Sequence, residues 1–147
     1  EIYELRELLE RHAAGIARAV ATRADVALLR DLAERIDNAG TDDPQGAFAL
    51  NRQFHERLCA PCGNGLLLGL LAQVWSQQAA LRIFTRSTQG GGQAFADRTS
   101  AEHHAILEAY GERDAVRVRD LVREHIAGAH EATVRLLVAG RRAEEVA

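Results

Sequence analysis

Apolar side chains recur every three or four positions along almost the whole chain, which is the spacing of helices with one buried face. Such segments lie at about residues 2–22, 25–38, 44–60, 64–81, 96–110 and 115–137. Valine, isoleucine and threonine never alternate with polar residues over the length of a strand. The pattern therefore predicts an all-α fold, and the short connections indicate an antiparallel bundle of about six or seven helices.

Capping residues support several of these boundaries. Asp25 is a suitable N-cap for the second helix, Pro44 follows two aspartates, and Asn64 precedes the fourth helix. The fifth helix should start near Ala96 or Thr99, after a glycine-rich segment. The face of the first helix that should contact the core carries aliphatic side chains, namely Ile2, Leu5, Leu8, Leu9, Ile16 and Val20.

The size of the chain fits one domain over residues 1–147, with 47% hydrophobic and 27% charged residues. The net charge is −3, and acidic and basic residues are mixed along the helices without a basic cluster. Nucleic-acid binding usually requires such a cluster, so we do not expect this segment to bind DNA.

No apolar run is long enough to cross a membrane, and no secretory signal is present. Cys59 and Cys62 form one isolated Cys-Ala-Pro-Cys unit without the strands of a redox fold, so we interpret them as ordinary reduced cysteines. These features predict a cytoplasmic protein.

Three histidines fall on three different predicted helices, at or beside the face that should be buried. At about 100° per residue, His103 and His125 lie centrally on their apolar faces and His55 lies at the edge of its own. A buried imidazole needs a polar partner, and three that converge could hold a cation or an anion. Asn51, one turn before His55, would present an amide oxygen to the same point.

The alternative that these histidines have only a structural role remains open, because a single histidine on an apolar face is more often an ordinary core residue. His12 also falls on the predicted face of the first helix and has no evident partner. His104 and His130 lie off their apolar faces and should be exposed to solvent. Gln78 and Arg82 continue the apolar line of the fourth helix, either as a polar pocket wall or where that helix leaves the core.

The order of several motifs resembles the FCD domain, the effector-binding domain of the FadR branch of GntR-type bacterial transcription regulators. The matching segments are Tyr3-Glu4-Leu5-Arg6, then Asn51-Arg52-Gln53-Phe54-His55 with Gly63-Asn64, then Ser100-Ala101-Glu102-His103, and finally Asp114-Ala115 with His125-Ile126. Together they cover essentially the whole chain. The resemblance implies a helical bundle that follows an N-terminal winged helix-turn-helix, which is absent from this sequence.

The resemblance also implies a site and partners. Asn51, His55, His103 and His125 would bind a divalent metal ion, zinc first and nickel or manganese as alternatives. A small carboxylate effector would bind beside the metal, contacting Arg82 and Gln78 together with Asn51, His103 and His125. The regulator would act as a homodimer that binds DNA only through the separate winged-helix domain, and we expect no enzymatic activity.

Asn51 departs from the family, in which this position is commonly aspartate. Three neutral imidazoles and an amide would leave the +2 charge of the ion uncancelled, so such a site should attract an anion more strongly. Two other interpretations remain. One is a metal-free sensor of an anionic or acyl ligand. The other is a mononuclear metal-dependent hydrolase, whose best general base, Glu102, lies off the His103 face.

Overall fold

The computed structural model describes residues 1–39, 42–86 and 93–144, leaving the side chains of 44, 79–86, 93 and 140–144 undescribed. These parts of the chain form α-helices and one short 3-10 helix, and they contain no strand, which confirms the all-α prediction. The elements in chain order are α1 (Ile2–Val20), α2 (Arg23–Ala39), α3 (Pro44–Cys59), η1 (Ala60–Cys62), α4 (Gly65–Arg86), α5 (Gln93–Gly111) and α6 (Ala115–Glu144).

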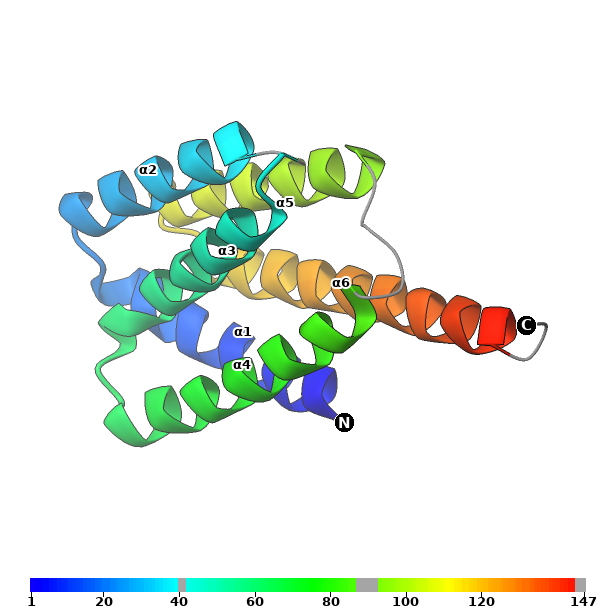
Figure 1. Cartoon of the computed structure of the whole chain (residues 1–147). Coiled ribbons are helices and arrows are strands. Elements are labelled where there is room, and N and C mark those ends of the chain that lie inside the picture. Colours follow the sequence, from blue (N-terminus) through cyan, green and yellow to red (C-terminus); the bar gives the residue numbers. More distant parts are fainter. Residues whose placement is uncertain (40–41, 87–92, 145–147) are drawn as a thin grey trace.

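The helices form a bundle, and the C-terminal part of the long helix α6 extends beyond the other helices (Figure 1). One side of the bundle is made by α1, which packs against α6, α4 and α3. The other side is made by α2 and α5, which contact each other, while α2 also packs on α3 and α5 on α6. The helices α1, α3, α5 and α6 therefore surround one interior, and polar side chains that point inward from them can meet.

Local capping determines where several helices begin. Thr22 and Asp25 form a capping box at the start of α2, in which the Thr22 amide donates to the Asp25 carboxylate at 2.7 Å and the Asp25 amide donates to Thr22 Oγ1 at 3.3 Å. Asp25 was predicted as the N-cap, but Thr22 holds that position. Asp43 accepts from the amide of Gly46 at 2.9 Å, and Asn64 Oδ1 accepts from the amide of Leu67 at 3.1 Å. Most predicted boundaries hold within a few residues. However, α5 starts earlier than expected, at Gln93, and α4 and α6 extend past the predicted ends near 81 and 137, to Arg86 and Glu144.

The predicted core face of α1 is wrong. Leu5, Leu8 and Val20 are 52%, 57% and 62% exposed, and Ile16 is also exposed. The buried face is instead made of small, aromatic and charged residues, namely Tyr3, Arg6, Glu10, Ala13, Ala14, Gly15, Ala17 and Arg18. Alanines at the core allow α1 to approach α6 closely, so the larger aliphatic side chains lie on the other face.

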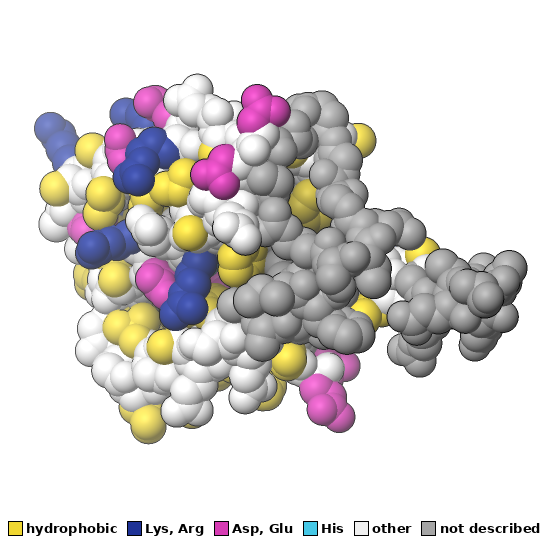
Figure 2. Space-filling view, in the orientation of Figure 1, with side chains coloured by type: hydrophobic (Ala, Val, Ile, Leu, Met, Phe, Trp, Pro, Cys, Tyr) yellow, Lys and Arg dark blue, Asp and Glu magenta, His cyan; other side chains and the backbone are white. Residues whose placement is uncertain are grey.

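The surface carries mixed charge. On the face shown in Figure 2, arginine and acidic side chains are interspersed with hydrophobic ones, and they do not gather into a basic stripe. No helix in the described ranges is long and apolar enough to span a lipid bilayer.

Candidate metal centre

The three histidines singled out from the sequence meet in the interior. His55 comes from α3, His103 from α5 and His125 from α6, and their rings are 0%, 1% and 4% exposed. One ring nitrogen from each can be chosen so that all three lie within 4.8 Å of one another. This is a spacing from which imidazoles could share one cation.

Two of the histidines approach each other through their Nε2 atoms. His55 Nε2 and His125 Nε2 lie 3.1 Å apart. Two nitrogens bound to one tetrahedral ion at about 2.05 Å are separated by about 3.4 Å, so this pair already has nearly the required spacing. The three chosen nitrogens lie within 4.8 Å of one another, so some of them would have to come closer together to share one tetrahedral ion.

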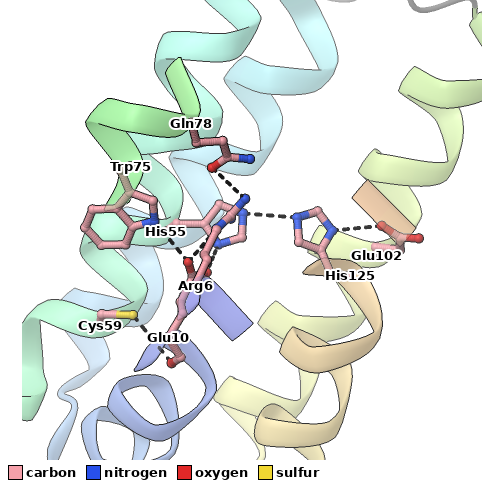
Figure 3. A network of polar contacts seen from close by, with 8 residues as sticks. All are labelled: Arg6, Glu10, His55, Cys59, Trp75, Gln78, Glu102 and His125. Atoms are coloured by element: carbon pink, nitrogen blue, oxygen red, sulfur yellow. Dashed lines mark hydrogen bonds and ion pairs between the residues drawn. The ribbon is translucent and has the colours of Figure 1, made fainter. Parts of the chain in front are cut away.

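In two of the three rings, Nδ1 faces a carboxylate, and we call this nitrogen the outer one because it points away from the cluster. His125 Nδ1 lies 2.8 Å from Glu102 Oε2, and His55 Nδ1 is in contact with Glu10 Oε1 (Figure 3). If each Nδ1–H is donated to the facing carboxylate, the two Nε2 atoms are left facing each other, where they could bind one shared cation. Carboxylates are the usual hydrogen-bond partners of the ring nitrogen that a metal-binding imidazole does not offer to the metal.

His103 has a different environment. Its ring lies against Phe54, with centroids 4.6 Å apart, and neither of its nitrogens has a hydrogen-bond partner among the described residues. Burial, together with the nearby His125 and His55, holds the pKa of His103 well below its usual range, so the ring is neutral at pH 7. A buried neutral imidazole with both nitrogens unsatisfied is a suitable metal ligand.

Asn51 is half-buried one turn before His55 on α3. Its Oδ1 is buried and has no hydrogen-bond partner in the described parts of the chain. A buried amide oxygen without a donor costs free energy, and a hard cation would satisfy it. An amide oxygen and three imidazoles are donor types that suit a divalent first-row ion, and metal binding by Asn51 together with the three histidines stays a prediction.

The two polar residues predicted to continue the apolar face of α4 are Gln78 and Arg82. Gln78 is buried, and its Oε1 accepts a hydrogen bond from Arg6 Nη1 at 3.0 Å. The side chain of Arg82 lies outside the described residues, so its proposed contact with an effector stays a prediction.

The remaining histidines do not join the cluster. His12 is exposed, and His104 is exposed and lies 2.8 Å from the Asp37 carboxylate. His130 was expected to face solvent, but it is half-buried because its ring stacks on Tyr3 at 5.1 Å. Glu102, which was suggested as a general base, contacts His125 on the side away from His55.

Sequence reasoning missed an acid–base pair on α1. Arg6 Nε donates to Glu10 Oε2 at 2.8 Å, and Trp75 Nε1 donates to the same oxygen at 3.0 Å. Burial alone would raise the pKa of Glu10, but Arg6 and His55 hold it far below its usual range, so the carboxylate is ionised. The available signal was the spacing of Arg6 and Glu10, which falls in register with the alanines at 13 and 17.

The two cysteines are free. Cys59 is buried beside the same acidic residue, with its Sγ 3.8 Å from the backbone oxygen of Glu10. Burial and the charge of Glu10 raise the pKa of this thiol well above its usual range. Cys59 is therefore a protonated core residue, in line with the interpretation of the Cys-Ala-Pro-Cys unit as ordinary reduced cysteines.

Comparison with known families agrees with this architecture. The FCD domain family matches residues 1–128. The chain belongs to the FCD domain family. This FCD domain is 30% identical over 107 residues to a protein described as the transcriptional regulatory protein NedR of Micromonospora viridifaciens, covering 71% of the chain and 70% of NedR.

Solved structures share the fold of this FCD domain. McbR (YncC) of E. coli superposes with a TM-score of 0.84 at 20% identity, over 92% of this chain and 67% of McbR. GntR of Streptococcus agalactiae gives a TM-score of 0.73 at 26% identity, over 89% of this chain and 57% of that protein. The FCD domain therefore corresponds to part of longer regulators in both comparisons.

Proposed function

We propose that this FCD domain is the ligand-sensing part of a GntR-type transcription regulator that binds a small carboxylate effector at a metal ion held by Asn51, His55, His103 and His125. The observation that carries the proposal is the meeting of three buried imidazoles from α3, α5 and α6 in a domain of this family. Zinc suits this donor set, and nickel and manganese are alternatives.

The charge of the donor set supports a carboxylate as the effector. Four neutral ligands leave the full +2 charge of a bound ion in a low-dielectric interior, and a carboxylate would cancel part of it. On α4, Gln78 would offer the effector its amide N–H groups, because its Oε1 is already taken by Arg6, and Arg82 would offer a guanidinium.

The proposed regulatory effect depends on which helices carry the metal-binding residues. An ion and effector bound at this point would hold three helices together, and they would shift the domain between two arrangements by their difference in affinity for them. In a homodimer, such a shift would change the relative position of two DNA-binding domains, each supplied by a separate winged-helix segment.

The test uses thermal unfolding with a panel of small mono- and dicarboxylates, in the presence of zinc and again with a chelator. The expected result is a rise in Tm with one class of acid that disappears when the metal is removed. A rise that persists in metal-free protein would contradict the metal site and favour direct binding of the anion by the histidines.

Asn51→Asp is the matched variant for the charge argument. It adds one negative charge at the first ligand position, so it should bind zinc more tightly and the carboxylate more weakly than the native domain. Calorimetric titration measures both affinities. Weaker carboxylate binding by the native domain than by Asn51→Asp would refute the argument.

A further inference from the structure

A buried acid–base pair on α1, Arg6 and Glu10, contacts the histidine cluster through His55. Arg6 and Glu10 are 2% and 0% exposed and lie one turn apart on the same face of the helix. Moving two charges from water into a protein core is costly unless nearly all of their polar atoms are paired. The partners of this pair on other helices therefore indicate what it does.

Those partners belong to two further helices. Glu10 contacts His55 Nδ1 on α3 and accepts from Trp75 Nε1 on α4 at 3.0 Å, while Arg6 donates to Gln78 on α4 at 3.0 Å (Figure 3). One carboxylate thus joins α1 to the first histidine of the cluster and to α4. Arg6 and Trp75 both donate to Glu10 Oε2, which leaves Oε1 directed at His55.

The carboxylate that contacts His125, that of Glu102, has weaker contacts with its surroundings. Glu102 contacts His125 Nδ1 at 2.8 Å but is 27% exposed, and its nearest arginine contact, with Arg98, is 3.8 Å long. The two outer carboxylates are therefore not equivalent. Glu10 is enclosed and fixed from two helices, whereas Glu102 lies at the margin of the core.

We propose that Glu10 is a positioning residue that holds the His55 ring for a cation and makes α1 part of the metal centre. This inference rests on the proposed metal site. A carboxylate that accepts from the outer nitrogen of a ligand fixes which ring nitrogen faces the ion and increases its basicity, and losing such a partner typically weakens metal binding 10- to 100-fold. Here that nitrogen is His55 Nε2, which points at His125.

The same contact provides a route from metal occupancy to α1. A cation that fixes His55 also fixes Glu10 and, through Trp75 and Arg6, the packing of α1 against α4. Local opening of α1 then becomes less favourable when the ion is bound, because opening would break the contact that holds a metal ligand. Amide protection of α1 should therefore depend on both the metal and the Glu10 carboxylate.

The experiment compares the native domain with Glu10→Gln, and with Glu4→Gln as an exposed control that loses the same charge on the same helix. Cobalt(II) serves as the probe, with affinity measured by competition with a chromophoric chelator and the ligand set followed by visible absorption. Glu10→Gln should bind cobalt 10- to 100-fold more weakly, with shifted absorption bands. Glu4→Gln should match the native domain in both.

Hydrogen exchange provides the second readout. Saturating zinc should slow amide exchange in α1 of the native domain and of Glu4→Gln. In Glu10→Gln the protection should persist in α3 and α6 but be lost in α1. Native-like affinity, spectrum and α1 protection in Glu10→Gln would overturn this inference and leave the proposed function standing, whereas a native domain that binds no cation would overturn both.

Further variants guard against a failure to fold. Glu10→Gln leaves Arg6 buried without its counter-charge, so the double variant Arg6→Met with Glu10→Gln removes both charges together. It should fold and show the same loss of cobalt affinity and of α1 protection. Glu10→Asp, which keeps a carboxylate, should recover part of the affinity. Native-like binding by the double variant, or no recovery with Glu10→Asp, would contradict the proposed role.

Discussion

At the scale of single residues, the proposed metal centre includes one imidazole that stays neutral inside the protein, that of His103. Burial and two neighbouring histidines lower its pKa, and neither of its nitrogens has a partner in the described parts of the chain. Protonation of this ring would place an unpaired charge in the core. The folded domain therefore resists a proton that the unfolded chain accepts.

This difference predicts acid sensitivity of the metal-free domain. With its pKa lowered in the folded state, His103 binds fewer protons there than in the unfolded chain, so stability falls as the pH drops below the ordinary histidine value of about 6.5. Urea unfolding of chelator-treated protein should give a lower free energy of unfolding at pH 5.5 than at pH 7.5. His103→Gln should reduce this difference, and an unchanged stability between the two pH values would contradict the account.

The residues of the cluster could be foreseen from the sequence, but their outer partners could not. Periodicity placed His55, His103 and His125 on inward faces, and the structure brings them together. Glu10 was missed because a search for large apolar side chains treats charged residues as surface, although a hydrogen-bonded acid–base pair can be buried. The contact of Glu102 with His125 depends on how two helices pack, which no single-helix pattern contains.

At the scale of elements, the type and order of the helices followed from the sequence, and the burial of α1 did not. Its inner face is defined by alanine and by a charged pair, whereas its exposed leucines gave the stronger apolar pattern. The buried face of α2, in contrast, consists of apolar side chains. Leu29, Leu32, Ala33 and Ile36 are buried along it in helical spacing.

Two adjacent leucines of α2 therefore give a matched test of its packing. Leu29 is 0% exposed and Leu28 is 39% exposed, so the same truncation removes a core side chain in one case and a partly solvated one in the other. Leu29→Ala should lower the free energy of unfolding by about 2–5 kcal/mol, and Leu28→Ala by clearly less. Chemical denaturation measures both. Equal losses for the two variants would show that the assigned face of α2 is wrong.

At the scale of the whole molecule, the bundle brings one imidazole from each of three helices close together. Glu10 of α1 contacts one of them, His55. The family and the fold agree with a regulatory domain, and the FCD domain covers 67% and 57% of the two regulators compared by structure. The proposed function requires a ligand that binds alternative packings of the helices with different affinity. The three imidazoles come from α3, α5 and α6, so a ligand bound to all of them would be sensitive to how these helices pack.

The central claim is that the buried histidine cluster binds one divalent metal ion. The most direct measurement is the metal content of the purified domain by elemental analysis after dialysis against zinc, compared with a variant in which His55, His103 and His125 are all replaced by alanine. The account predicts one equivalent of metal per native chain and none in the triple variant. A native domain free of metal, or an equal metal content in both proteins, would contradict it.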